Sequence, residues 1–157
     1  MAENAFVAQA PALDRALIAK SHPHIIGGAG WFWWIAGLSL VNTVLIHSGS
    51  NTNFVIGLGF TLVADAMFKA YKVVAFSIDA VALGTFAGLG FLARRGQLWA
   101  YVTGLVLYAL DALIYLAFQD WMSVAFHGLA LFYLFRGARQ LHADLKTAAA
   151  EPPVASA

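Results

Sequence analysis

The sequence predicts an all-α integral membrane protein with four transmembrane helices, and three observations lead to that class. Hydrophobic residues make up 61% of the chain and charged residues only 11%, against roughly 25% charged in soluble domains. Apolar runs long enough to cross a bilayer recur along the chain. Two of these runs, within Leu98–Arg136, are separated only by a short polar break, which is typical of a helical hairpin.

Four runs are expected to span the membrane, at about 27–46, 73–93, 98–118 and 121–138. A helix over 98–118 would be about 31 Å long, which matches a hydrocarbon core of about 30 Å. The return run is shorter, so Arg136 must snorkel along its end. Trp31, Trp33 and Trp34 near the start of the first run suit an aromatic belt at the membrane surface.

The two ends of the chain are expected to lie outside the bilayer. Residues 1–24 lack the order of a cleavable signal peptide and contain helically spaced apolar positions, so we expect a cytoplasmic amphipathic segment. His22 and His24, on either side of a proline, are interpreted as the end of that helix rather than as a metal pair. Residues 25–142 form the membrane domain, and 143–157 are expected to be a disordered cytoplasmic tail.

The segment 54–72 is the ambiguous one, because it could be re-entrant, interfacial or spanning. If it does not cross, seven of the nine Lys and Arg residues fall on one side, and only Lys69 and Lys72 fall on the other. If it crosses, the split is four against five. The positive-inside rule therefore favours four spans, with both termini in the cytoplasm of the inner (plasma) membrane. Segment 54–72 would then be a helix at the outer side, where Asp65 and Lys69 are spaced as an i,i+4 pair.

The titratable groups inside the predicted spans, His47, Asp79, Asp111 and His127, all fall in one leaflet. A charged group at mid-bilayer costs several kcal/mol, so such residues pair, face the bundle interior or mark a binding site. Asp111 and His127 lie on the two arms of the hairpin, each about 9 to 12 Å below the same surface, and are expected to meet. The predicted outer-leaflet cluster comprises Asp79, Asp111, His127, His47, Tyr108, Tyr115 and Asn42.

This cluster is open to two interpretations. It could tie the helices together as a hydrogen-bonded network, or it could bind a small ligand, a metal or a proton. The candidate metal ligands are His47, His127, Asp111 and Asp79, although no HExxH spacing supports them. The metal therefore stays unassigned, and no cofactor is expected. Asp120 is set apart, since its place directly before Trp121 is typical of a helix N-cap.

Ala80, Gly84 and Gly88 recur every four residues within the second span. Small residues at this spacing form a groove that lets another helix approach closely. We expect the groove to pack inside the bundle, with a homodimer contact as the alternative.

Other functional classes find little support in the sequence. The formal charge of +1 and the scattered Lys and Arg residues do not make a nucleic-acid footprint. The chain has no cysteine, which excludes disulfides, thiolate metal sites and Cys nucleophiles. No GxSxG elbow surrounds Ser50 or Ser123, and no P-loop is present. These absences favour a non-enzymatic protein.

Residues 93–141 carry a family likeness in three parts: the ARRGQ turn, the LYALD step and the QDW turn. This block resembles one in small, uncharacterised bacterial multi-span membrane proteins, which implies a bacterial membrane origin and brings no activity. We therefore expect an accessory or self-associating helical bundle whose partners are the bilayer and a second copy or a larger membrane complex. The alternative is a ligand, metal or proton binding or transport unit built on the Asp/His cluster.

Overall fold

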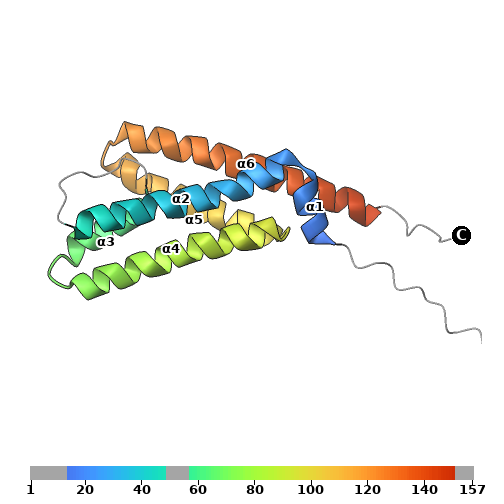
Figure 1. Cartoon of the computed structure of the whole chain (residues 1–157). Coiled ribbons are helices and arrows are strands. Elements are labelled where there is room, and N and C mark those ends of the chain that lie inside the picture. The colour runs from blue at the N-terminus through green and yellow to red at the C-terminus, as the bar shows by residue number, and fades with distance from the viewer. Residues whose placement is uncertain (1–13, 49–56, 151–157) are drawn as a thin grey trace, which may run out of the picture.

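A computed structural model, which describes residues 14–48 and 57–150, shows a chain built from helices (Figure 1). Within these residues there are six α-helices and no strand: α1 (Arg15–Ser21), α2 (Pro23–His47), α3 (Gly59–Met67), α4 (Lys72–Arg94), α5 (Leu98–Ala117) and α6 (Trp121–Ala150). The all-α prediction is confirmed. Three helices, α2, α4 and α5, are long and apolar enough to cross a membrane, and α6 is not among them.

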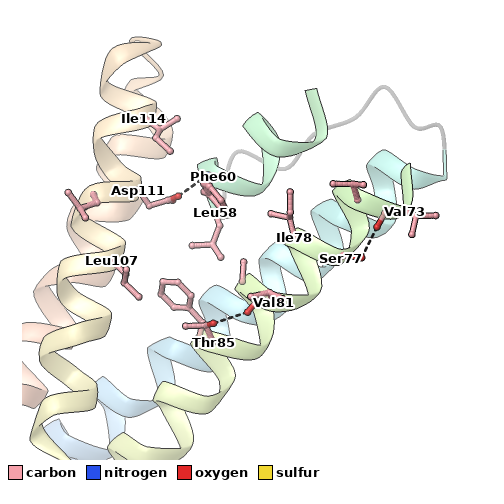
Figure 2. A pocket seen from close by; sticks show the side chains of 14 residues that line it. Leu58, Phe60, Val73, Ser77, Ile78, Val81, Thr85, Leu107, Asp111 and Ile114 are labelled. Carbon is pink, nitrogen blue, oxygen red and sulfur yellow. Dashed lines mark hydrogen bonds between the residues drawn. The ribbon is translucent and has the colours of Figure 1, made fainter. Parts of the chain in front are cut away.

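The four long helices lie side by side (Figure 1). α2 packs against α4 and α6, and α5 packs against α6 and α4. α1 lies at one end of this bundle, against α2, α4 and α6, and α3 packs on α4 and α5 at the other end. α4 and α5 diverge toward α3, whose first residues sit between them (Figure 2). With nine residues, α3 is about 14 Å long, too short to cross a bilayer.

The bundle places bulky apolar side chains on its outside. Val81 is 70% exposed, Trp121 66% and Phe118 73%, and many other large apolar side chains are exposed to a similar degree. Soluble monomers rarely expose contiguous apolar patches of this kind, whereas the hydrocarbon of a bilayer solvates them well. The exposed surface therefore agrees with the membrane class that the composition predicts.

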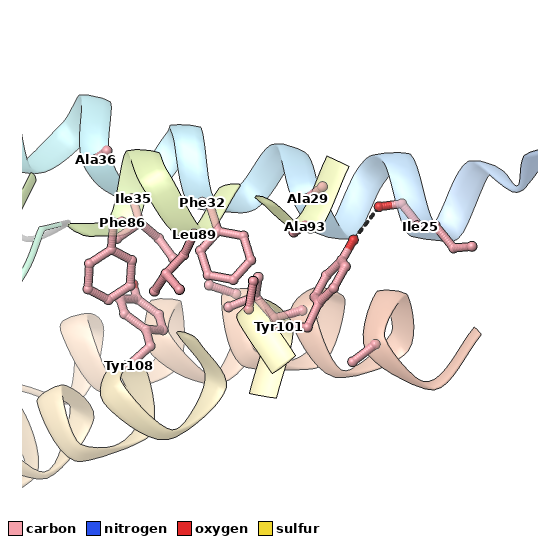
Figure 3. Packing of buried hydrophobic residues seen from close by; sticks show 14 of the residues in the cluster. Ile25, Ala29, Phe32, Ile35, Ala36, Phe86, Leu89, Ala93, Tyr101 and Tyr108 are labelled. Carbon is pink, nitrogen blue, oxygen red and sulfur yellow. Dashed lines mark hydrogen bonds between the residues drawn. The ribbon is translucent and has the colours of Figure 1, made fainter. Parts of the chain in front are cut away.

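A run of aromatic rings fills the interior from the α1 end toward the middle (Figure 3). Phe32 of α2 contacts Tyr101 and Phe86, with ring centroids 5.8 and 6.3 Å away, and Phe86 meets Tyr108 edge-on at 6.0 Å. The Tyr101 hydroxyl donates a hydrogen bond to the carbonyl of Ile25. Because this phenol is fully buried, that bond removes the cost of an unpaired hydroxyl.

Close helix contacts are made by glycines that the sequence did not single out. A Cβ added at Gly28 of α2 would lie 3.0 Å from the Cα of Gly137 in α6, so the two backbones nearly touch. The ring of Phe32 occupies the space where Gly104 lacks a side chain. These positions provide the small-residue packing inside the bundle.

The expectation that Ala80, Gly84 and Gly88 pack inside the bundle is wrong. All three are exposed, and a Cβ added at Gly84 or Gly88 would meet no atom within 4 Å. The physical reason is that α4 turns its opposite face inward, with Ala75, Asp79, Phe86, Leu89 and Ala93 buried. The alternative, a contact with a second copy, stays a prediction.

The predicted start of the C-terminal tail at residue 143 is also wrong, because α6 continues to Ala150. The segment is rich in good helix formers and has no proline before residue 152. Gln140 donates to Asp144 at 2.8 Å, an i,i+4 bond along the helix surface. Residues 1–13, 49–56 and 151–157 lie outside the described residues, and so do the predictions that fall on them.

The predicted N-terminal helix is present as α1, and a single glycine lets it dock. Asp14 caps it by accepting from the N–H groups of Ala16 and Leu17 at 3.0 and 3.1 Å. The turn between α4 and α5 contains Gly96 with φ of 74°, and a Cβ there would overlap the carbonyl of Arg15. Gly96 is therefore required both by its own backbone conformation and by the close approach of α1.

Gly96→Ala should lower the stability of the protein by about 1 to 3 kcal/mol, because alanine is strained at positive φ and its methyl would push α1 away. Thermal unfolding in detergent measures the change. Gly30→Ala is the matched control, since nothing lies within 4 Å of a Cβ at that helical position. Equal melting temperatures for wild type and Gly96→Ala would show that α1 does not dock on this turn.

Candidate functional site: the α3 anchor

α3 begins without a cap of its own. Its N-cap residue is Leu58, whose side chain cannot accept a hydrogen bond. The carboxylate of Asp111 on α5 replaces the missing cap: the N–H of Gly59 donates to Oδ2 and the N–H of Phe60 donates to Oδ1, both at 2.9 Å. The start of α3 is thus held by a residue more than fifty positions away, and we call Asp111, His127 and the segment 57–60 the α3 anchor.

His127 of α6 completes the anchor from the other arm of the hairpin. Its Nε2 lies 2.9 Å from Oδ2 of Asp111, so the predicted meeting of these two residues is confirmed. The imidazole stacks on the ring of Tyr108, with centroids 4.2 Å apart and planes 15° from parallel, and meets the ring of Tyr115 at 4.9 Å. His127 is fully buried and Asp111 is 5% exposed. Tyr108, Asp111 and Tyr115 share one buried face of α5, as their spacing predicts.

The hydrogen bonds define how many protons the pair carries. Nδ1 of His127 lies 2.8 Å from the backbone carbonyl of Ser123, which only accepts, so Nδ1 bears a hydrogen. The contact between Nε2 and Asp111 requires one further hydrogen. Asp111 and His127 together are therefore neutral. The two N–H groups of α3 and its helix dipole favour the arrangement with a carboxylate on Asp111 and an imidazolium on His127.

α2 and α5 together fix the segment before α3. The N–H of Leu58 donates to Oγ of Ser39 at 2.9 Å, and the hydroxyl of Tyr115 donates to the carbonyl of Gly57 at 3.3 Å. A Cβ on Gly59 would lie 2.8 Å from the ring of Tyr115. Glycine at position 59 therefore lets the chain pass close enough to the tyrosine ring to reach Asp111.

The structure divides the predicted cluster into two parts at the same end of the bundle. Asp79 is buried between α4 and α2, where the Thr43 hydroxyl donates to its Oδ2 at 2.9 Å. Asn42 is buried beside Gly57, since a Cβ on that glycine would overlap its amide nitrogen. Ser39, Asn42 and Thr43 are all buried, so these polar residues of α2 face the interior of the bundle. The side chain of His47 lies outside what the structure describes.

Asp120 is the N-cap of α6, as its position predicts. Its carboxylate accepts from the Ser123 hydroxyl at 2.7 Å and from the Ser123 N–H at 3.3 Å. These bonds stabilise the charged form, so the hydrogen bond from the Ser123 hydroxyl above all holds the pKa of Asp120 below its ordinary value of 3.8.

The geometry leaves the α3 anchor few free ligand atoms. Both ring nitrogens of His127 face protein acceptors, and three of the roughly four lone-pair sites of the Asp111 carboxylate are engaged. Among residues 14–48 and 57–150, no three His, Asp or Glu side chains lie together as a metal site. At the other end, Nε2 of His24 lies 2.7 Å from the Arg136 guanidinium and accepts from it, and Nδ1 of His22 accepts from the His24 N–H at 3.3 Å. These contacts fit the predicted helix end rather than a metal pair.

Two parts of the anchor were not predicted from the sequence. These are the hydrogen bond from the Leu58 N–H to Ser39 and the close passage of Gly57 and Gly59 past the side chains of Asn42 and Tyr115. Two features of the sequence could have indicated the contact between α3 and Asp111. The helical segment has an apolar residue, Leu58, at its N-cap position, and Asp111 lies within an apolar run. A helix start without a local acceptor needs one from another element.

Asp111→Asn and His127→Gln should each destabilise the protein by about 3 to 5 kcal/mol, because each leaves the other member of the buried pair without its charged partner. Asp111→Asn should cost more, since it also weakens the hold on α3. The double variant should cost less than the sum of the two single changes. Chemical or thermal unfolding of the four proteins in detergent provides the cycle. Strict additivity would mean that the 2.9 Å contact contributes nothing to stability.

Comparison with protein-family models, with curated proteins and with solved structures found no match to this chain. The bacterial likeness of residues 93–141 stays a prediction.

Proposed function

We propose that this chain is a non-enzymatic multi-pass membrane protein whose four long helices form a bundle that associates with a second copy of itself. The observation that carries the proposal is the exposed face of α4 at Ala80, Gly84 and Gly88. The same helix also exposes bulky side chains, such as Phe76 at 57% and Val81, one turn before Gly84, at 70%.

An exposed small-residue face is what helix association in lipid requires. Lipid tails are as apolar as leucine, so helices associate by close packing rather than by escape from water. Nothing lies within 4 Å of a Cβ added at Gly84 or Gly88, so the backbone of α4 is open to a second helix there. When the partner is another copy, the same face meets itself about a two-fold axis.

The α3 anchor supports a structural role for the buried polar residues. Asp111 and His127 are bound to each other and to backbone groups, which ties α3, α5 and α6 together. The alternative is a ligand, metal or proton unit built on these residues, and its metal-binding form predicts stoichiometric metal in the purified protein. Elemental analysis and visible absorption separate the two readings.

We infer that α6 is the fourth span, since it packs along both α2 and α5. The charges then follow the positive-inside rule. Arg15 contacts the turn at Gly96, and Arg136 bonds His24, so the basic ends of α1, α4 and α6 gather at one end of the bundle. Only Lys69 and Lys72 lie at the α3 end. Both termini would be cytoplasmic and α3 would lie at the outer face.

Gly84→Leu should abolish self-association while leaving the fold intact, because the new side chain enters the space between two copies. Light scattering after size-exclusion chromatography in detergent gives the oligomer mass, and the melting curve reports the fold. Gly128→Leu is the matched control, since that glycine is also helical, exposed and open. A monomeric wild type, or an oligomer that Gly84→Leu leaves unchanged, would contradict the proposal.

The orientation can be tested with single cysteines, because the chain has none. Cysteines at Ser50 and Lys72 should react in intact cells with an impermeant maleimide. Cysteines at Gln97 and Thr147 should react only after the membrane is opened. Labelling at Gln97 from outside would exclude the four-span arrangement.

A further inference from the structure

Exposed positive charge gathers at the end of the bundle where α1 lies (Figure 1). Seven of the nine Lys and Arg residues are at this end, and all seven are exposed: Arg15, Lys20, Arg94, Arg95, Arg136, Arg139 and Lys146. Of the six aspartates in the described residues, only Asp14 and Asp144 are here, and they accept hydrogen bonds from the start of α1 and from Gln140. Within residues 14–48 and 57–150, none of the seven cations is ion-paired with a carboxylate.

One of these cations, Arg94, is held in place by an aromatic ring. Its guanidinium lies over Trp33 of α2, 5.6 Å from the ring centroid. Trp33 in turn packs on Gly90, one turn before Arg94, since a Cβ on that glycine would lie 3.1 Å from the indole Nε1. The contact therefore depends on the close approach of α2 and α4 at Gly90. A guanidinium that stacks on a ring keeps the N–H groups at its edge free to donate.

The protein leaves these donors unengaged. Within the described residues, the guanidinium of Arg94 makes no hydrogen bond, and neither does that of Arg95, which lies 4.3 Å from the centroid of the Phe91 ring. The backbone of Arg15 lies beside the following turn, because a Cβ on Gly96 would overlap the Arg15 carbonyl. We call Arg15, Arg94 and Arg95 the arginine patch. Planar, charged donors of this kind suit the oxygens of a phosphate group.

The arginine patch lies at the level of the lipid headgroups. α4 has 23 residues and is about 35 Å long, slightly more than a hydrocarbon core of about 30 Å. Its last residue, Arg94, therefore reaches the membrane surface. Trp33 and Trp34 of α2 and Trp99 near the start of α5 are exposed at the same end, as in an aromatic belt.

The surroundings of the patch fit a phospholipid better than a soluble phosphate. Phe91, one turn before the two arginines, is 49% exposed, and Trp33 is 43% exposed. An acyl chain can pack on these rings while the phosphate above it reaches the guanidinium groups. The helix dipoles do not oppose an anion here, because the negative end of α4 at Arg94 is offset by the positive end of α5 at Leu98.

We propose that the arginine patch binds the phosphodiester of an anionic membrane phospholipid. Arg94, held on Trp33, donates to the phosphate oxygens, and Arg15 and Arg95 add positive charge beside it. The proposal goes beyond self-association through Gly84 and does not depend on it, nor on which side of the membrane the α1 end faces.

The test uses the full chain, purified in detergent and mixed with phosphatidylglycerol or phosphatidylcholine, and native mass spectrometry counts the retained lipids. Wild type should prefer phosphatidylglycerol by at least about fivefold, and Arg94→Gln should lower its retention about fivefold without affecting phosphatidylcholine. Lys146→Gln is the matched control. It removes the same charge at the same end, but about 38 Å from the start of α6 and so beyond the headgroup level, and should change nothing.

Trp33→Leu removes the ring under Arg94 without a change of charge, and should lower phosphatidylglycerol retention about two- to fivefold. Trp34→Leu, the same change at the adjacent exposed tryptophan, is its control and should retain the lipid as wild type does. Melting curves and oligomer masses, recorded for each variant, verify that the fold and the assembly are unchanged.

Three results would overturn the proposal. Equal retention of the two lipids by wild type would exclude a site for an anionic headgroup. Equal losses in Arg94→Gln and Lys146→Gln would show that net charge alone attracts the lipid. Displacement of phosphatidylglycerol by an equal concentration of glycerol phosphate would assign the patch to a soluble phosphate instead.

Discussion

The neutral pair of Asp111 and His127 is the interaction on which the rest of the described structure depends. A nine-residue helix is too short to be stable in isolation, and α3 has no cap residue of its own. Asp111 supplies that cap and His127 balances its charge, so the pair is tolerated in a region of low polarity. The position of α3 and the contact between the two arms of the hairpin both depend on this pair.

The two ends of the bundle bury different kinds of side chain. At the α1 end the interior is aromatic and aliphatic, and glycines let the backbones of α2 and α6 approach. Apart from the tyrosine hydroxyls, the buried polar side chains of the described residues lie at the α3 end: Ser39, Asn42, Thr43, Thr61, Asp79, Asp111, Ser123 and His127. Hydrogen bonds have strict distances and angles, so this end determines which arrangement the helices adopt, while the apolar end supplies packing.

Local patterns in the sequence were sufficient for the features that depend on neighbours along the chain. The lengths of the apolar runs predicted α2, α4 and α5, and similar depths on the two sides of the QDW turn predicted that Asp111 meets His127. The partner of the α3 start could not be predicted, because it depends on which face α5 turns toward residues 59 and 60. The four-residue spacing of Ala80, Gly84 and Gly88 likewise did not indicate whether that face of the helix points into the bundle or outward. A small-residue stripe is the same pattern whether it faces a neighbour within the chain or lipid.

The distance along the chain between α3 and its cap has a consequence for biosynthesis. Gly59 and Asp111 are 52 positions apart, and His127 follows 16 positions later. At about 5 to 20 residues per second, the ribosome needs about 3 to 10 seconds to add the residues between Gly59 and Asp111. During that interval α2 is already made and α4 is being added, while α3 has no acceptor from α5 for its first N–H groups. The start of α3 can therefore be capped only after α5 has been made, and the α3 anchor is complete only when α6 brings His127 to Asp111.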